Sequence, residues 1–183
     1  MQSEFEMIDL GEMTYFLGME INQSNDGIFV CQERYTNEVL RKFGIENCKP
    51  MDTPLVPNLK LSKDDGAMRV DEGLFRSLIG YLLYLTATRP DLMFASNYLS
   101  KFMSNPSELH FRAAKRVLRY VKGSIGLGIW FKKSENLKLL GYTNSDWGGS
   151  FDEMKSTLGY VFYINSGAIC WLSKKQETVA QPQ

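Results

Sequence analysis

The sequence predicts an α+β fold in which a β-hairpin and a block of helices are followed by an antiparallel sheet. Three observations predict it. Asp26-Gly27 joins two apolar runs, apolar residues recur at helical spacing over 72–123, and the spacing changes to every second residue from Gly126 onward. The chain has 183 residues, 44% of them hydrophobic and 23% charged, which suits one ordinary globular domain or two small ones.

The N-terminal part is expected to form a hairpin and one helix. Residues 14–22 and 27–32 are the expected strands, because Gly27 tolerates the positive φ of a tight turn. Residues 33–43 carry apolar side chains at helical spacing, and Gly44 is the expected C-cap. The next segment, 45–71, contains three prolines and few large apolar groups, so we expect an extended linker there.

A second helical block is expected over residues 72–123. Leu74–Leu85 has the composition of a buried helix, and Pro90 prevents its continuation. Asp91 or a neighbour is expected to start the next helix, which runs to about Met103.

The last helix of this block has a clear start signal. Asn105 is the expected N-cap, Pro106 the first helical residue, and Glu108 the side chain that reaches back to the cap. We expect this helix to run to about Lys122, with Gly123 behind it.

The C-terminal part is expected to form an antiparallel meander. Its four expected strands are Leu127–Phe131, Leu137–Tyr142, Leu158–Ile164 and Ala168–Leu172. Asn165-Ser166-Gly167 is a tight turn that joins the last two. If no helix covers this sheet, apolar residues on one of its faces are left exposed.

Composition limits the functional classes. The formal net charge is zero, so any case for nucleic-acid binding depends on local clusters of charge. Cys31, Cys48 and Cys170 are widely spaced and form no CxxC pair, which predicts free thiols in a reducing compartment. The acidic N-terminus has no signal-peptide pattern, and no apolar run approaches the roughly 20 residues of a membrane helix. We therefore expect an intracellular protein of the cytoplasm or nucleus, neither secreted nor membrane-bound.

Five cations gather on one face of the predicted helix over 106–122, spread over roughly a third of its circumference. They are Arg112, Lys115, Arg116, Arg119 and Lys122. Such a stripe is typical of a helix lying along a phosphate backbone. The alternative is a solvated cationic face on a core helix.

Acidic residues near the last strands are the other candidates for chemistry. Two-metal hydrolysis needs carboxylates that converge on ions about 3.5–4 Å apart. Asp146 is the candidate here, whereas Asp152 and Glu153 are expected in a solvated loop. His110, without a Ser or Cys nucleophile pattern beside it, is expected to be structural.

Several motifs resemble one family in its own order. They include Phe5–Ile21, Met51-Asp-Thr-Pro54, Arg76–Thr86, Thr88-Arg-Pro-Asp91, His110–Gly123, Gly141–Gly149, Ser156–Phe162 and Trp171–Gln176. Over essentially its whole length the chain resembles the Pol polyprotein of copia-type LTR retrotransposons.

The resemblance implies a division of the chain into four segments. Residues 1–44 correspond to the end of a reverse-transcriptase palm, with a hairpin in the region that holds the primer end. Residues 45–71 are an extended linker, 72–123 are thumb-like or connection-like helices, and 124–183 are the N-terminal part of an RNase H-like domain. The basic helix then faces a template–primer or RNA–DNA hybrid. Intact members use Mg²⁺.

The departures from the family pattern concern catalysis. No Tyr-x-Asp-Asp occurs in the sequence, and Asn144 stands where the family pattern Gly-Tyr-Ser-Asp-Ala-Asp has its first aspartate; Asp146 matches the second. Either position, 144 or 146, could be the family's metal ligand. The family's Glu-Ala-Glu helix does not follow Ala180 here. We therefore expect no cofactor in this chain and a truncated, catalytically inactive Pol remnant. The alternatives are a non-enzymatic nucleic-acid-binding fragment or a mis-split piece of an active polyprotein.

Overall fold

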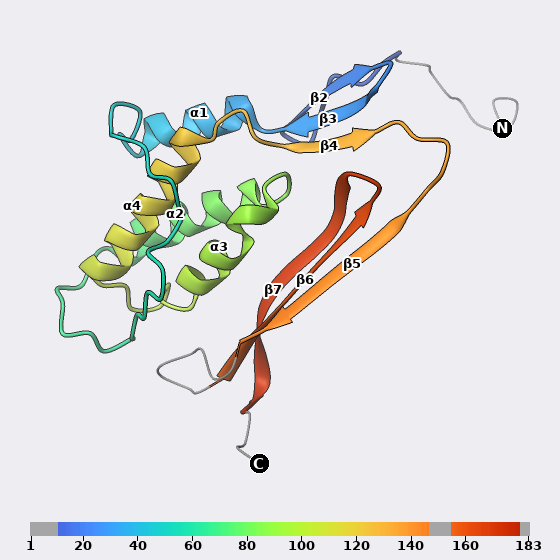
Figure 1. Ribbon diagram of the computed structural model, residues 1–183. Coiled ribbons are helices and arrows are strands. Elements are labelled where there is room, and N and C mark those ends of the chain that lie inside the picture. The colour runs from blue at the N-terminus through green and yellow to red at the C-terminus, as the bar shows by residue number, and fades with distance from the viewer. Residues whose placement is uncertain (1–10, 147–154, 180–183) are drawn as a thin grey trace, which may run out of the picture.

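The computed structural model describes residues 11–146 and 155–179. Figure 1 shows the helices gathered on the left, strands β2–β4 at the upper right beside α1, and β5–β7 as a long ribbon that passes beside α3. Helices and antiparallel sheets therefore form largely separate parts of the molecule, which confirms the α+β class. An RNase H-like arrangement of the last strands stays a prediction.

The first sheet has the order β1-β2-β3-β4, with all neighbours antiparallel. Its strands are β1 Tyr15–Phe16, β2 Met19–Ser24, β3 Gly27–Cys31 and β4 Ile129–Lys132. The hairpin between β2 and β3 is the one expected from Asp26-Gly27, with Ser24 paired to Gly27.

The single strand expected over residues 14–22 is wrong, because a tight turn divides it. Leu17 and Gly18 both have positive φ, at 48° and 76°. A Cβ at Gly18 would overlap the phenol of Tyr84, whose hydroxyl donates to the Leu17 carbonyl at 2.5 Å. Helix α2 (Glu72–Leu85), which carries Tyr84, therefore holds this turn in place.

The expected partner of the strand near residue 129 is also wrong. β4 pairs with β3, where Trp130 lies opposite Phe29, and does not join the C-terminal meander. Alternation of apolar residues identifies a strand, but it does not identify the strand beside it. The sheet thus joins two segments about a hundred residues apart in the chain.

The helices are α1 Glu33–Lys42, α2 Glu72–Leu85, the 3₁₀ turn η1 Pro90–Leu92, α3 Met93–Ser100 and α4 Glu108–Gly123. Gly44 follows α1 with a φ of 63°, as expected of a C-terminal glycine. Their apolar faces share one core, which includes Val39, Leu40, Phe75, Leu78, Leu82, Leu99, Val117, Leu118 and Val121.

The start of α4 differs from the sequence expectation. Ser107, not Asn105, is the N-cap, and His110, not Glu108, is the side chain that reaches back. The Ser107 amide donates to Nδ1 of His110 at 3.0 Å. A histidine performs the role that a glutamate usually has in a capping box.

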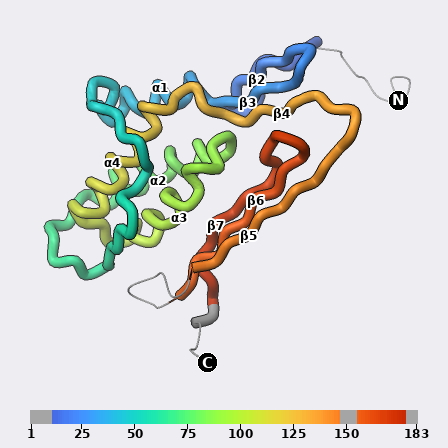
Figure 2. The backbone as a smooth tube through the Cα atoms, viewed as in Figure 1, coloured from blue at the N-terminus to red at the C-terminus, as the bar shows by residue number. Residues whose placement is uncertain are grey.

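Residues 45–71, here called the strap, contain no helix or strand and cross the surface of α4 (Figure 2). The Met51 amide donates to the Arg119 carbonyl at 3.2 Å. At its far end Arg69 forms an isolated antiparallel bridge with Ser107. The expected extended linker is therefore packed along the helix.

The second sheet is an antiparallel meander of β5 Leu139–Ser145, β6 Lys155–Ile164 and β7 Gly167–Val179. Asn165, with a φ of 53°, starts the expected turn between β6 and β7. The half-buried Val161, Tyr163 and Trp171 share the face that lines the cleft described below. On the other face of the sheet Phe162 is 40% exposed.

Candidate functional site

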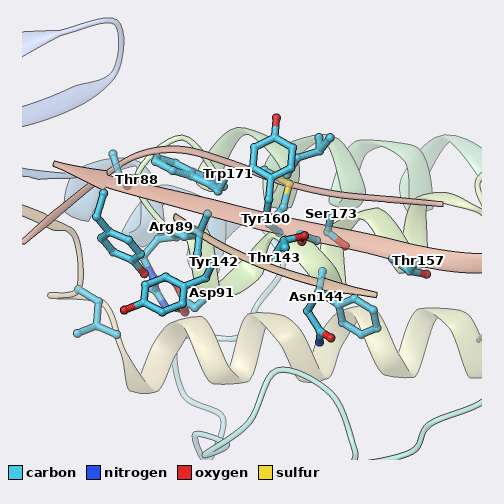
Figure 3. A pocket seen from close by; sticks show the side chains of 18 of the residues that line it. Thr88, Arg89, Asp91, Tyr142, Thr143, Asn144, Thr157, Tyr160, Trp171 and Ser173 are labelled. Atoms are coloured by element: carbon cyan, nitrogen blue, oxygen red, sulfur yellow. Dashed lines mark hydrogen bonds and ion pairs between the residues drawn. The ribbon is translucent and has the colours of Figure 1, made fainter. Parts of the chain in front are cut away.

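A cleft of about 750 Å³ lies between the α2–α3 connection and one face of the second sheet. Figure 3 shows Trp171 beside Thr88 at one end of this cleft and Asn144 toward the other end. Its lining is mainly aromatic and aliphatic with a few polar groups, which is the usual composition of a ligand site.

One wall is built around an ion pair. Arg89 is 3% exposed, and its Nε and Nη2 donate to the two carboxylate oxygens of Asp91 at 2.9 and 2.7 Å. The same guanidinium donates to the carbonyl and hydroxyl oxygens of Ser124, both at 2.8 Å. These bonds fasten the η1 turn to the end of α4.

The charge state of this wall follows from its contacts. Burial raises the pKa of Asp91, but the hydrogen bonds and charge of Arg89 outweigh that effect and hold the pKa below its usual value. The Tyr120 hydroxyl donates to the same carboxylate at 2.9 Å, and burial together with this bond raises the pKa of Tyr120. Asp91 is therefore an ionised, fully engaged carboxylate, unsuited to act as a general base.

The opposite wall is the sheet. Tyr142 on β5, Val161 on β6 and Trp171 on β7 are cross-strand neighbours, so their side chains lie on one face. The indole Nε1 of Trp171 donates to the Thr86 carbonyl at 2.9 Å. This bond ties the second sheet to the end of α2 and sets the width of the cleft.

The two positions that the family pattern marks for metal binding, 144 and 146, have different surroundings in the structure. Asn144 lines the cleft. Asp146 is at the end of β5, where its Oδ1 accepts a hydrogen bond from the Thr157 amide and its own amide donates to the Thr157 carbonyl at 3.2 Å. Asp152 and Glu153 lie outside the described residues. Among residues 11–146 and 155–179, no three His, Cys, Asp or Glu side chains gather as metal ligands.

The five cations of α4 are divided by the strap. Arg116 Nη2 donates to Thr53 Oγ1 at 2.9 Å, Arg119 Nε donates to the Lys49 carbonyl at 2.7 Å, and Lys122 Nζ donates to the Cys48 carbonyl. Arg112 and Lys115 are exposed; Arg112 lies 3.7 Å from Glu108. Three members of the stripe thus hold a segment of this chain, and the nucleic-acid role of all five stays a prediction.

His110 is buried and structural, as expected. Its Nδ1 accepts from the Ser107 amide, so its Nε2 carries the proton and lies 3.0 Å from the Ser62 carbonyl. Its ring stacks on Phe102 with centroids 3.9 Å apart. The Ser107 hydroxyl donates to Asp65 and holds the pKa of that carboxyl below its usual value. Ser107, His110 and Asp65 lie together, but Ser107 and His110 are fully buried and the hydrogen bonds of all three stabilise the cap.

Sequence reasoning missed the cleft wall. Thr88-Arg-Pro-Asp91 was interpreted as a helix break and a possible cap. In the structure α3 starts at Met93, its N-cap is Leu92 without a side-chain hydrogen bond, and Asp91 pairs with Arg89. The sequence signal that could have indicated this ion pair was the triplet Arg89-Pro90-Asp91, in which opposite charges flank a proline.

No helix in the described part of the chain has the length and apolarity to cross a bilayer.

Comparison with known proteins gives the relationships of the chain. A family profile described as reverse transcriptase (RNA-dependent DNA polymerase) matches residues 1–57. The chain is 39% identical over 181 residues to the Retrovirus-related Pol polyprotein from transposon RE1 of Arabidopsis thaliana, covering 99% of this chain and 12% of that protein. It is 39% identical to the uncharacterized mitochondrial protein AtMg00810 of the same plant, covering 99% and 75%.

A third relative is the Retrovirus-related Pol polyprotein from transposon TNT 1-94 of Nicotiana tabacum, 38% identical over 98% of this chain and 14% of that protein. The chain therefore spans about an eighth of the Pol polyproteins and three quarters of the mitochondrial protein. No solved structure matches. By identity over nearly all of its length, the chain belongs to the copia-type retrotransposon Pol family.

Proposed function

We propose that this chain is a non-catalytic segment of a copia-type Pol protein, which by itself neither synthesises DNA nor cleaves RNA–DNA hybrids. The observation that carries the proposal is the pair Asn144 and Asp146. The first is a neutral carboxamide that lines the cleft, and the second has an oxygen committed to the Thr157 amide.

The chemistry explains why this pair does not fit a Mg²⁺ pair. Hydrolysis through two metal ions needs several charged oxygens that converge within a few ångströms. A carboxamide offers one neutral carbonyl oxygen, and the carboxylate of Asp91 that also lines the cleft is paired with Arg89. We therefore derive no metal-dependent step for this chain.

The test is cleavage of an end-labelled RNA–DNA hybrid by the purified chain with Mg²⁺ or Mn²⁺. We expect no divalent-dependent turnover. The matched variant Asn144→Asp restores the family's residue at this position, and we expect it to remain inactive because a single carboxylate does not complete the site. Appreciable metal-dependent turnover by the wild-type chain, lost on Asp146→Asn, would overturn the proposal.

A second candidate function is weak, sequence-independent binding of a template–primer or RNA–DNA hybrid by α4. The exposure of Arg112 and Lys115 favours it. Binding should weaken steeply with salt, because each neutralised phosphate releases counterions. Arg112→Glu with Lys115→Glu should abolish it, whereas replacement of the exposed Lys133, directly after β4, by Glu should not. Equal binding by both variants would refute this role.

The hypothesis of a truncated remnant and that of a mis-split polyprotein predict different genomic sequence on either side of this reading frame. An in-frame Tyr-x-Asp-Asp upstream and Glu-Ala-Glu downstream would show that the chain is a piece of a longer polyprotein with its sites restored. A reading frame interrupted on both sides would support the remnant hypothesis.

A further inference from the structure

A second cavity of about 750 Å³ lies between the strap and α4, on the side of α4 that carries the cations. Its apolar surface comes from both walls. The strap supplies Met51, Val56 and Leu59, and α4 supplies Leu109 and Ala113. Val56 and Leu109 are 48% and 41% exposed, so aliphatic surface is accessible within the cavity.

The charged residues around this cavity are all cations. They are Lys60, Arg112, Lys115, Arg116 and Arg119, and no acidic residue is among the described residues that line it. Glu108 lies 3.7 Å from Arg112 and offsets part of that one charge. Clustered like charges with low-dielectric walls create a positive potential that attracts an anion into the space between them.

Arg116 supplies a more specific indication. Its Nη2 donates to Thr53 and its Nη1 lies 3.5 Å from the Met51 sulfur, but its Nε is buried and has no hydrogen-bond partner among the described residues. A buried charged donor without an acceptor is costly, and an anionic oxygen from a ligand would satisfy it.

We propose that this cavity binds an amphiphilic anion, with an aliphatic body against the strap and α4 and a single carboxylate or similar head group beside Arg116. The two requirements are separate. The apolar walls would favour a chain of several methylenes, because each one buried adds to the affinity. The cations would select the sign of the head group. The inference does not rest on the proposed function.

The class of ligand follows from excluding the simpler occupants. A small inorganic anion would leave Val56 and Leu109 in contact with water. A neutral or cationic amphiphile would leave the clustered positive charge without an anion and the Arg116 Nε without an acceptor. A volume of about 750 Å³ is within the usual range for small-molecule sites.

The test uses sodium decanoate below its micelle concentration, titrated into the full chain and followed by calorimetry and by the methyl signal of ¹³C-labelled Met51. We expect saturable binding that shifts the Met51 signal. Acetate, which has the head group without the body, and decyltrimethylammonium, which has the body with the opposite charge, should each bind at least tenfold more weakly.

Variants locate the site. Arg116→Gln should weaken decanoate binding about tenfold, the effect of losing one charge-assisted hydrogen bond. Because Arg116 also holds Thr53, a second variant avoids any loosening of the strap: Lys115→Gln with Leu109→Ser, both exposed, should weaken binding about threefold or more. Lys133→Gln, directly after β4, should leave binding unchanged.

Two results would overturn the inference. One is equal affinity for decanoate and decyltrimethylammonium, which would indicate unspecific surfactant binding. The other is unchanged decanoate affinity in the Lys115 and Leu109 double variant. The double variant tests the proposed anion site even if Arg116→Gln fails to fold.

Discussion

The start of α4 depends on His110, and replacing this residue tests the whole account of the helical core. His110→Ala removes a fully buried ring that accepts from the Ser107 amide at 3.0 Å and lies 3.0 Å from the Ser62 carbonyl. It also removes the stack on Phe102, with centroids 3.9 Å apart and planes inclined by 14°. The variant leaves the Ser107 hydroxyl cap in place.

The magnitude follows from these contacts. Loss of the reach-back partner in a cap costs about 1 kcal/mol, loss of the part-buried hydrogen bond to the Ser62 carbonyl costs about 0.5–1.5 kcal/mol, and an aromatic pair contributes about 0.5–1.5 kcal/mol. Such effects are not additive within one cluster. We therefore expect the free energy of unfolding to fall by about 3 kcal/mol, near the upper end for a single substitution.

The assay is urea unfolding followed by circular dichroism at 222 nm. Glu108→Ala is the matched control, because it removes the residue that a standard capping box would use. Glu108 instead lies 3.7 Å from the exposed Arg112, so its loss should cost about 0.5 kcal/mol or less. A larger effect from Glu108→Ala than from His110→Ala would refute the structural assignment of the cap.

Three further predictions concern the connections between parts of the molecule. Gly18→Ala should destabilise the β1–β2 turn by about 1–2 kcal/mol, because residue 18 has a φ of 76° and its Cβ would overlap the phenol of Tyr84 on α2. Urea unfolding measures the change, and a neutral substitution would show that the turn is not held against α2. Trp171→Phe removes the donor to the Thr86 carbonyl and should cost about 1 kcal/mol and increase amide exchange in β7; unchanged exchange would contradict the tie between sheet and helices. The pKa of Asp91 is lowered in the folded chain, so the stability that it contributes with Arg89 is present above about pH 4 and lost as pH falls through the folded pKa. Thermal unfolding from pH 7 to pH 2 should therefore show a smaller acid loss in Asp91→Asn, and an equal loss would refute this linkage.

The sequence predicted the local structure of individual elements better than it predicted which elements pair with one another. The Asp26-Gly27 hairpin, the helix ending before Gly44 and the Asn165 turn each depend on backbone preferences of a few adjacent residues, and all three are confirmed. The pairing of β4 with β3 depends on a contact across about a hundred residues, which alternation of apolar side chains does not encode.

Prediction of the caps failed for a different reason. Asn105-Pro106 and Glu108 satisfy every local rule for a helix start, yet Ser107 and His110 cap α4. The difference lies in tertiary contacts, because Asp65 of the strap accepts from the Ser107 hydroxyl and Ser62 lies against the far side of the imidazole. Those partners are distant in sequence and leave no local pattern.

The candidate site was predictable only in part. The sequence context singled out positions 144 and 146. Asn144 lines the cleft, whereas Asp146 is not among the residues that line it and accepts a hydrogen bond from the Thr157 amide. The Arg89–Asp91 wall opposite it was interpreted as a helix break. Similarly, the spacing of Arg116, Arg119 and Lys122 correctly places them on one face of α4, but spacing cannot show that the strap accepts their hydrogen bonds.

The central claim is that no pair of divalent ions is held where the family pattern places its carboxylates. Titration of Mn²⁺ into ¹⁵N-labelled protein tests it directly, because a bound paramagnetic ion broadens amide signals around it. We predict no saturable, selective broadening at Thr143–Asp146 and Thr157. Stoichiometric Mn²⁺ binding that broadens those amides, and is lost on Asp146→Asn, would contradict the account.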